Sequence, residues 1–567
     1  MKILATQISI LLRQGAARRN MLYLAIFAGV LILLVGIFTT LFHIIMVYED
    51  QDHSWISGLY WTLVTMSTLG FGDITFHSDI GRFFSVVGLL SGMIFLLVLL
   101  PFTFIEFFYA PFVKAQQEAR APRSVPPTLQ DHVIIIHYDQ VAAAFIQRLK
   151  NYNLPYILVV KNVEEALRLH DEGLKVVVAD LEEPEAFANC GFNRAVMVAA
   201  TADDFTNTSI AFTAREHSKR ALIVATAISA DSVDVLQLAG ANHVLQLGEI
   251  LGSALARRTS ASDAQSHVIG NFGKLQIAES MVAGTPLINK KLKDTRLREL
   301  VGVTVVGLWQ RGKFVSPSPD SVFTSDTMLV LAGTPDQLAA YNALFCIYHR
   351  SQASILIIGA GRVGRAAAKT FDESGVDWRI LEQNAARIRN PEKYTLGSAA
   401  DRSALERAGL KETPAVIITS REDAVNIYLS IYCRKLRPDV QIIARANSEG
   451  NVGRLHDAGA DVVMSYAGMG SNSLFNLLRR ENTLLVAEGL NIFRVPAPSA
   501  FIKHSIKDSN IRTHTGCSII ALQNGEEQII NPPPDILIEE HHELILIGTH
   551  AAEEEYCRIY STQKITS

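Results

Sequence analysis

The order of apolar and polar residues divides the 567-residue chain into two unlike parts. Two long apolar runs lie near its start, Met21 to Val47 and Phe83 to Ile105. At about 1.5 Å of rise per residue, each run can cross a hydrocarbon core of roughly 30 Å as a helix. We therefore expect transmembrane helices over residues 21–47 and 80–108. From residue 131 onward the apolar runs are short and rich in β-branched residues, which is typical of buried strands.

The segment between the two spans holds an amphipathic stretch and then a glycine-rich loop. The stretch covers residues 54–67, and the loop consists of Thr68, Leu69, Gly70, Phe71, Gly72 and Asp73. The two glycines can take a positive φ, so that successive carbonyls can point the same way. Non-helical backbone is tolerated at membrane depth only where protein buries it or where it lines a water-filled path. The pattern predicts a pore helix over 54–67 and an ion-selective loop over 68–73; the alternative is a surface turn between two helices.

The second span contains the candidate gate. An interior glycine costs a helix about 1 kcal/mol relative to alanine, so Gly92 is expected either to act as a hinge or to allow close helix packing. Met93, Leu97 and Leu100 share one face of an α-helix, and a ring of such apolar side chains can close a pore by excluding water. The alternative for Leu97 is a side chain that faces lipid.

Charge predicts how this part of the chain is oriented. Basic residues precede the first span and follow the second, whereas the loop between the spans is acidic. The positive-inside rule then places residues 1–20 in the cytoplasm as an N-terminal segment. Residues 111–130 are proline-rich and are expected to form a short, semi-rigid linker on the same side. We expect a multi-pass protein of the cell (inner) membrane, in contact with lipid, whose remaining residues are cytoplasmic.

The cytoplasmic part alternates short strands with helices, in the manner of a doubly wound parallel sheet. Five strands are expected in a first series, at Val133 to Ile136, Ile157 to Val160, Val176 to Val178, Ala195 to Val198 and Leu222 to Ala225. Five more are expected in a second series, at Ile355 to Ile358, Arg379 to Leu381, Tyr394 to Leu396, Ala415 to Ile418 and Gln441 to Ala444.

The two series are copies of one unit. Ala239-Gly240-Ala241-Asn242 in the first matches Ala458-Gly459-Ala460-Asp461 in the second, and Gly333-Thr334 matches Gly548-Thr549 beyond the sheets. Each copy is expected to contain an α/β N-terminal lobe and a small β-rich C-terminal lobe. The expected bounds are 131–348 for the first domain, with lobes 131–260 and 274–348, and 351–567 for the second, with lobes 351–480 and 484–567.

In the second copy a glycine-rich turn follows a strand and opens a helix. The turn runs Gly359-Ala360-Gly361-Arg362-Val363-Gly364, and Glu382 ends the next strand. The glycines allow a pyrophosphate to approach the helix N-terminus, and an acid at this distance suits the hydroxyls of a ribose. Arg362 and Arg365 either contact phosphate or are solvated. The prediction is a nucleotide site made by Gly359, Gly361, Arg362, Val363, Gly364, Arg365 and Glu382; the alternative is a structural turn only.

The first copy lacks this pattern. His137, Asp139 and Ala142 stand at the three glycine positions, and Val160 replaces the acid. Larger side chains and the Asp139 charge would exclude a pyrophosphate. We predict that the first copy does not bind a dinucleotide.

Composition excludes some partners. With 52 basic and 56 acidic residues and no basic stripe, a formal net charge of −4 argues against a nucleic-acid partner. Five widely spaced cysteines, without a Cys-x-x-Cys pair, argue against disulfides and against a zinc site.

The loop Thr68-Leu69-Gly70-Phe71-Gly72-Asp73 resembles the potassium channel signature Thr-Val-Gly-Tyr-Gly-Asp. With the doubled domain, the chain resembles prokaryotic two-transmembrane potassium channels that carry tandem RCK (regulator of K⁺ conductance) domains. The resemblance implies a ligand-gated, K⁺-selective homotetramer with eight RCK domains in a gating ring, in which the carbonyls of Thr68 to Phe71 and the Thr68 hydroxyl bind K⁺. The protein is not expected to be an enzyme. Phe71 lacks a tyrosine hydroxyl and Val64 replaces a common carboxylate, which puts the rigidity of the filter in question.

The same resemblance implies ligands for the ring, namely NAD⁺ or NADH, with ADP as a competitor. The family's Gly-Asp pair is Gly397-Ser398 here, with Asp401 nearby as a further candidate nucleotide residue. Calcium is another ligand class of the family and stays open, but the positions that match its glutamates are not acidic. They are Thr226, Ile228, Arg445 and Asn447. No metal site is therefore assigned.

Two other functions can be drawn from the same features. A subunit of a potassium transporter system would explain the doubled nucleotide-binding fold, but such soluble regulators have no filter of their own. A membrane-anchored NAD-dependent oxidoreductase would explain the glycine turn and leaves the pore loop unexplained.

Overall fold

The computed structural model describes residues 15–110, 113, 122–181, 183–259, 265–310, 313–325, 327–345, 353–479, 483–486, 490–525 and 527–560. The start of the predicted N-terminal segment, residues 1–14, and most of the first half of the predicted linker lie outside these residues. The chain divides into two compact units, one made largely of residues 1–121 and the other largely of residues 122–567. Each unit is described by itself.

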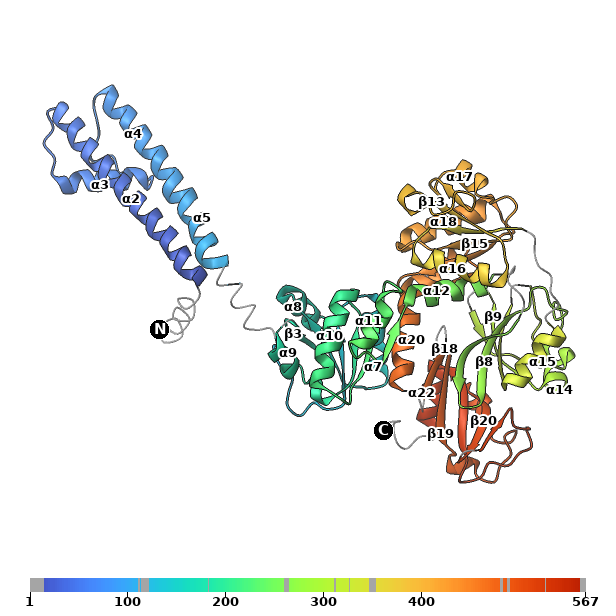
Figure 1. Ribbon diagram of the computed structural model, residues 1–567. Coiled ribbons are helices and arrows are strands. Elements are labelled where there is room, and N and C mark those ends of the chain that lie inside the picture. The colour runs from blue at the N-terminus through green and yellow to red at the C-terminus, as the bar shows by residue number, and fades with distance from the viewer. Residues whose placement is uncertain are drawn as a thin grey trace. The chain divides into compact units, whose positions relative to one another are not determined.

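The membrane unit contains two long helical stretches with a short helix between them (Figure 1). Its helices are α2 (Gly15–Tyr48), α3 (Trp55–Met66), α4 (Asp79–Gly92), α5 (Leu100–Phe104) and the π-helical segments η1 (Met93–Leu99) and η2 (Ile105–Tyr109). By length and composition, Ala25–Tyr48 and Asp79–Thr103 can cross a membrane. Helices are thus present where two spans and a pore helix were expected, although the first helix begins earlier, at Gly15.

An aromatic cluster joins the three helices of the membrane unit. Trp61 of α3 stacks on Phe84 of α4, with ring centroids 5.5 Å apart, and lies 5.2 Å from Phe42 of α2. The cluster is completed by Phe38, Met46, Met66 and Phe76. Large buried rings contribute much of the packing energy of such a core. The pore helix is therefore held on both sides by the two long helices.

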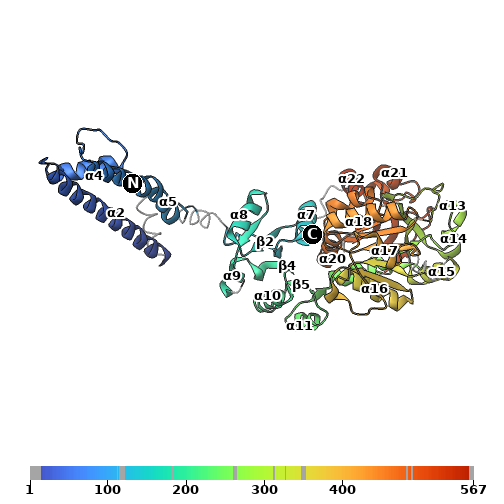
Figure 2. The ribbon, with the colours of Figure 1, turned by 90° about the horizontal axis from the view of Figure 1, so that it is seen from above.

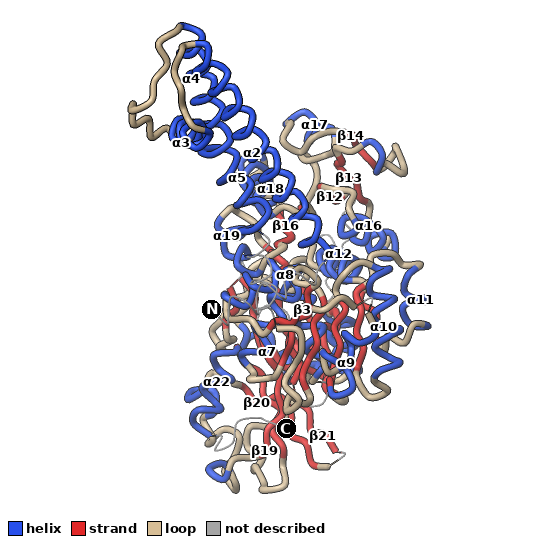
Figure 3. The backbone as a smooth tube through the Cα atoms, turned by 90° about the vertical axis from the view of Figure 1, so that its left-hand side faces the viewer, coloured by secondary structure: helices blue, strands red, loops and turns tan. Residues whose placement is uncertain are grey.

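The cytoplasmic unit contains two parallel sheets of six strands, each with the order 3-2-1-4-5-6 of a doubly wound nucleotide-binding fold (strands red in Figure 3). The first has β1 (His132–Ile136), β2 (Tyr156–Val160), β3 (Val176–Val178), β4 (Ala195–Ala200), β5 (Leu222–Thr226) and β6 (His243–Leu245). The second has β12 (Ile355–Ile358), β13 (Trp378–Glu382), β14 (Tyr394–Leu396), β15 (Ala415–Ile418), β16 (Gln441–Ala446) and β17 (Val462–Ser465). The sequence predicted five strands in each; β6 and β17 were missed because they are short and only partly buried.

Helices cover both parallel sheets. In the first copy they are α7 (Gln140–Asn151), α8 (Val163–Asp171), α9 (Pro184–Asn189), α10 (Asp204–His217), α11 (Ser232–Leu238) and α12 (Leu247–Arg257). In the second they are α16 (Arg362–Ser374), α17 (Arg402–Arg407), α18 (Asp423–Leu436), α19 (Val452–Asp457) and α20 (Tyr466–Leu478).

The last helix of each series packs on the other copy. Leu251 and Leu255 of α12 are fully buried in the core of the second sheet, against Ile357 and Phe371. In return, α20 lies beside α7 of the first copy (Figures 1 and 2). Gly252 makes this packing possible, because a Cβ there would lie 2.3 Å from the Val363 carbonyl of α16. The two copies therefore share their cores.

Two antiparallel sheets of five strands form the C-terminal lobes. The first has β7 (His267–Phe272), β8 (Leu275–Met281), β9 (Thr304–Gln310), β10 (Lys313–Val315) and β11 (Met328–Gly333), with α13 (Leu292–Thr295), α14 (Leu297–Val301) and α15 (Pro335–Phe345). The second has β18 (Thr483–Val486), β19 (Leu490–Pro496), β20 (Ser518–Asn524), β21 (Glu527–Ile530) and β22 (Glu543–Thr549), with α21 (Ile511–Thr515) and α22 (His550–Tyr560). One apolar cluster spans both sheets, so the lobes pack together. The first sheet begins at His267, earlier than the expected bound of 274.

Candidate functional site

The loop after the pore helix has the backbone that stacked carbonyls require. Thr68, Gly70 and Gly72 have φ values of 62°, 54° and 75°, whereas Leu69 and Phe71 between them do not have positive φ. This alternation turns successive carbonyls toward the same side of the chain. Both glycines were expected in this conformation. Thr68 was not, since a β-branched residue rarely takes a positive φ.

Three contacts tie the loop to its surroundings. The Val64 carbonyl of the pore helix accepts the Leu69 and Gly70 N–H groups, at 3.0 and 3.3 Å. Farther along, the Tyr60 hydroxyl lies close to the Asp73 carboxylate and interacts with it. Sequence reasoning missed Tyr60; its place four residues before Val64, on the same helix face, was the available signal. Tyr60 therefore gives the filter a support that neither Val64 nor Phe71 can give through its side chain.

A carboxylate outside the spans holds the segment after the filter. Glu49 follows α2 and accepts the His77 and Ser78 N–H groups at 2.8 and 3.0 Å, and it also accepts the Ser78 hydroxyl. The backbone bond from His77 and the Ser78 bonds lower the pKa of Glu49. Ser78 in turn caps α4 by accepting the Gly81 N–H. One acid thus joins the end of the first span to the start of the second.

The candidate gate lies on a π-helical segment. Met93 and Leu97 belong to η1, and Leu100 begins α5. A π-helix pairs residues five apart instead of four, so the α-helical spacing used to group these side chains does not hold through η1. Gly92, just before η1, packs against the pore helix: a Cβ there would lie 2.2 Å from Met66 Cα. Close packing against the pore helix is therefore enough to explain why residue 92 is a glycine.

The glycine turn of the second copy connects β12 to α16. Gly359 has a φ of 103°, which favours glycine, and a Cβ on Gly364 would lie 2.0 Å from the Gly359 carbonyl. A Cβ on Gly361 would meet nothing within 4 Å. Gly361 is the N-cap of α16 and offers no side-chain bond to the helix. The first N–H groups of α16 are thus free to bind an anion.

Glu382 lies beside this turn at the end of β13. It is only 4% exposed, and its two carboxylate oxygens accept the Ala360 and Asn384 N–H groups at 2.7 and 2.8 Å. Arg387 lies 3.9 Å from the same carboxylate. A carboxylate oxygen can accept more than one hydrogen bond, so Glu382 keeps capacity for a ribose hydroxyl.

The turn and the acid border one cavity of about 820 Å³. Of the predicted residues, Gly359, Gly361, Arg362, Val363 and Glu382 line it. The other three do not. Gly364 supports the turn, the Arg365 guanidinium donates to the Ala360 carbonyl at 2.6 Å, and Asp401 caps α17 by accepting the Ser403 N–H at 3.0 Å.

Further residues line the cavity that sequence reasoning did not assign to it. Thr419 and Arg421 follow β15, Arg445 is on β16, and Tyr428 and Tyr466 come from α18 and α20. Ligands of open α/β sheets bind at the carboxyl ends of the strands, which was the available signal for the first three. Tyr466 could not be found this way, because its helix, α20, comes after the second sheet in the chain but packs on the first copy.

The first copy closes its equivalent turn with its own side chain. His137 has a φ of 75°, as Gly359 does at 103°, so the turn itself is kept. Asp139 then caps α7 by accepting the Ala142 N–H at 2.7 Å. Burial raises the pKa of Asp139. Its carboxylate thus occupies the helix N-terminus that the second copy leaves open.

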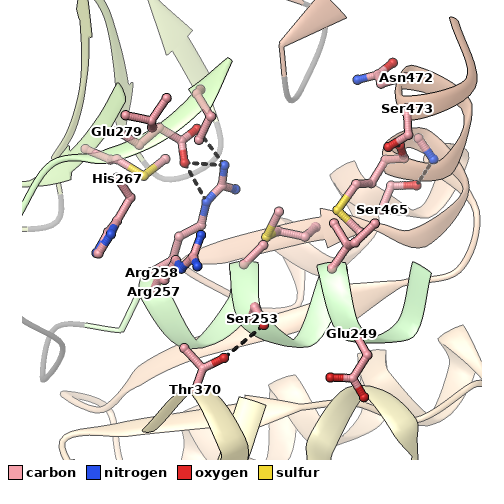
Figure 4. A pocket seen from close by; sticks show the side chains of 18 of the residues that line it. Glu249, Ser253, Arg257, Arg258, His267, Glu279, Thr370, Ser465, Asn472 and Ser473 are labelled. Carbon is pink, nitrogen blue, oxygen red and sulfur yellow. Dashed lines mark hydrogen bonds and ion pairs between the residues drawn. The ribbon is translucent and has the colours of Figure 1, made fainter. Parts of the chain in front are cut away.

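A larger cavity, of about 960 Å³, lies between the two copies and the first C-terminal lobe (Figure 4). Figure 4 shows Arg258 of the first copy pointing at Glu279 of β8; both are buried, and the pair has an N–O distance of 2.6 Å. On another wall Thr370 bonds Ser253 at 2.9 Å, which joins α16 to α12. The Arg258–Glu279 pair thus joins the two lobes of the first copy, and the Thr370–Ser253 bond joins the first copy to the second.

No metal site emerges from the described residues. The single candidate group there is Glu539, His541 and His542, in a turn of the second C-terminal lobe. His542 Nδ1 already accepts the Glu539 N–H at 3.1 Å, so binding through the other ring nitrogen requires that this bond be lost. Thr226, Ile228, Arg445 and Asn447 supply no carboxylate, as the sequence indicated.

The fold and the filter together define a potassium channel that carries RCK domains. Residues 30–109 match the family model for an ion channel, residues 133–247 and 355–466 match the TrkA-N domain, and residues 277–345 and 490–561 match the TrkA-C domain. The chain is similar to the solved structure titled GsuK channel bound to NAD, with 34% identity and a TM-score of 0.60 over 96% of this chain and 100% of that one. The chain belongs to the family of RCK-containing potassium channels.

Two further relatives agree with this assignment. The chain is 24% identical over 327 residues to a probable potassium channel protein of Methanocaldococcus jannaschii, covering 54% of this chain and 93% of that one. It is 26% identical over 225 residues to a TrkA homolog of the Trk potassium uptake system in Pyrococcus horikoshii, covering 37% of this chain and 98% of that one. These relatives are channels and uptake proteins. The transporter relative accounts for only part of the chain, whereas the channel assignment also includes the filter.

Proposed function

We propose that the chain forms a homotetrameric K⁺ channel of the inner membrane, in which an adenine nucleotide bound to the second RCK copy changes the open probability. NAD⁺, NADH and ADP are the candidate ligands. The channel is not expected to catalyse a reaction. One observation carries the nucleotide half: an uncapped helix N-terminus at Gly361 and the buried Glu382 border the same cavity. That pairing suits a pyrophosphate and a ribose.

Exposed apolar side chains support assembly into a ring. In the first copy, Phe205 of α10 and Leu238 of α11 are 90% and 87% exposed. In the second copy, Tyr428 and Ile431 of α18 are 50% and 53% exposed. Large exposed apolar residues gathered on one face mark interaction surfaces. Two such faces per chain, in four chains, suit a closed ring of eight domains around the fourfold axis that the filter requires.

The relative titled GsuK channel bound to NAD supports the choice of ligand. A ligand can shift opening only by the difference between its affinities for the two states. A tenfold difference per site is about 1.4 kcal/mol, and four sites together supply roughly 5.5 kcal/mol. That is enough to move a two-state gate from mostly shut to mostly open, or the reverse.

The test compares Gly361→Asp with Gly453→Asp in planar bilayers. A carboxylate on Gly361 would extend into open space at the helix N-terminus, as Asp139 does in the first copy, and should abolish the effect of nucleotide on open probability. Gly453 is exposed and also has open space around it, so its variant should behave as the native channel does. A native channel that ignores all three nucleotides would contradict the proposal.

A further inference from the structure

An unpaired arginine stands on the wall of the nucleotide cavity opposite Glu382. Arg445, near the end of β16, is 7% exposed, and its guanidinium lies 4.7 Å from the ring centre of Tyr466. One nitrogen donates to the Asn447 side chain at 2.5 Å, and Nε has no partner. The negative charge of Asp423 acts on Arg445, but within the described part of the chain no ion pair joins Arg445 to a carboxylate. A buried charge normally needs such a partner.

Two more arginines face the same cavity. Arg421 follows β15 and Arg362 begins α16, and both line the cavity with Arg445. Burial lowers the pKa of Arg445 to about 10, and the positive charges of Arg421 and Arg362 contribute to that shift. The three guanidinium groups are thus close enough to repel one another.

The acids nearby are already engaged. Asp423 accepts the Asn447 and Ser448 N–H groups at 2.6 and 3.2 Å. The positive charge of Arg362 acts on Asp204 of the first copy, but Asp204 accepts hydrogen bonds from two backbone N–H groups of its own copy. Glu422 is exposed at the cavity wall. Within the described part of the chain, none of these three acids forms an ion pair with Arg362, Arg421 or Arg445.

The order of the strands separates this cluster from the ribose acid. The sheet runs β14-β13-β12-β15-β16-β17, so Glu382 on β13 lies on one side of the glycine turn after β12. Arg421, which follows β15, and Arg445, on β16, lie on the other side. A ligand that spans the turn would place its ribose at one end and its far end among the arginines.

We propose that Arg362, Arg421 and Arg445 form a second anion subsite, which binds the terminal phosphate of a nucleoside diphosphate or triphosphate. A phosphate offers the charge and the several acceptor oxygens that guanidinium groups bind in pairs. The inference rests on the proposed function, because it assumes that the glycine turn and Glu382 hold the nucleoside end.

The experiment measures binding of AMP, ADP and ATP to the full-length purified channel by calorimetry. In the native channel the step from AMP to ADP should raise affinity by about tenfold or more, as expected for charge-assisted hydrogen bonds. Arg445→Met keeps the apolar stem over Tyr466 and removes the charge. It should leave AMP affinity within about threefold and reduce the gain from AMP to ADP at least fivefold.

Arg421→Met provides a second variant, because Arg421 is exposed and its loss should not disturb folding. Arg402→Met, on α17 outside the cavity, is the matched control and should keep the native gain. An unchanged gain in both Arg445→Met and Arg421→Met would overturn the subsite and leave the proposed function standing. Failure of AMP, ADP and ATP to bind the native channel would overturn this inference, and the proposed function falls with it if NAD⁺ and NADH also fail to bind.

Discussion

Gly92 illustrates what one residue can decide in the pore. Its position inside the second span allowed two explanations, a hinge or close packing. The distance of 2.2 Å from a Cβ at Gly92 to Met66 Cα shows that the α4 helix touches the end of the pore helix there. Sequence reasoning could not choose, because the choice depends on a neighbour that is distant in the chain.

Gly92→Ala should therefore destabilise the pore, by about 1 to 3 kcal/mol as for other overpacked cores. Gly88→Ala is the matched control, since a Cβ there would make ordinary contacts with Phe38 at 3.7 Å. Thermal unfolding of the purified channel measures the difference. If both variants melt as the native channel does, the packing role of Gly92 is wrong.

Gly70 is the second such residue, because its backbone conformation determines whether the filter can form. Its φ of 54° is strained for any residue with a Cβ, although the space around it is open. Gly70→Ala should abolish selective K⁺ current through backbone strain alone. Gly36→Ala, at a helical site with open space, is the control and should conduct normally. Selective current through Gly70→Ala would refute the assigned filter geometry.

At the level of single residues, the sequence predicted those that a local rule explains. Gly359, Gly361 and Glu382 follow from the spacing of a turn and the next strand. Tyr60 and Arg445 depend on partners brought in by the fold, so no local pattern identifies them. Asp401 was grouped with the nucleotide residues by its place in the chain, and it stays a prediction; its side chain caps its own helix.

At the scale of elements, the inner helix differs most from its prediction. An α-helix was expected throughout residues 80–108, and two segments are π-helical instead. Analysis of hydrophobic periodicity assumes a constant number of residues per helical turn, so it cannot locate π-helical segments, in which each turn contains more residues. We propose Leu97 as the constriction within η1.

Leu97→Asp should hold the constriction wet, because a ring of carboxylates cannot exclude water as leucines do. Single-channel recording should then show an open probability well above that of the native channel. A closed probability equal to the native one would indicate that Leu97 faces lipid.

The second feature at this scale is that α12 and α20 each pack on the copy to which they do not belong. Arg148 of α7 donates to Glu449 at 2.7 Å and to Asn472 of α20 at 2.7 Å, so it binds the first copy to the second. The sequence predicted the helices and their copies, but not which sheet each helix would cover. That exchange arises because α12 and α20 bury their apolar faces on the opposite copy.

Arg148→Met and Glu449→Gln, alone and combined, should reveal a coupling of about 1 kcal/mol in thermal unfolding. The value is modest because Glu449 is half exposed. The exposed pair Arg296 and Glu299, three residues apart, serves as the control and should show less coupling. No coupling between Arg148 and Glu449 would mean that their ion pair does not stabilise the packing of the first copy on the second.

At the scale of the whole molecule, repetition made the architecture predictable. The matches between Ala239-Gly240 and Ala458-Gly459 predicted two domains of one kind, and both have the same strand order. The stoichiometry stays a proposal, supported by two exposed apolar faces and the symmetry that a filter needs. The asymmetry between copies was also predicted, because Asp139 and Gly361 differ in a way that charge and size explain.

The most direct measurement of the central claim is ion flux in liposomes that contain the purified native protein. K⁺ and Na⁺ gradients are compared, each with and without added nucleotide. We predict K⁺ flux that greatly exceeds Na⁺ flux, a rate that nucleotide changes, and a selectivity that nucleotide leaves unchanged because the filter is separate from the ring. Equal K⁺ and Na⁺ flux would contradict the channel assignment, and a K⁺ flux that no nucleotide alters would contradict the gating.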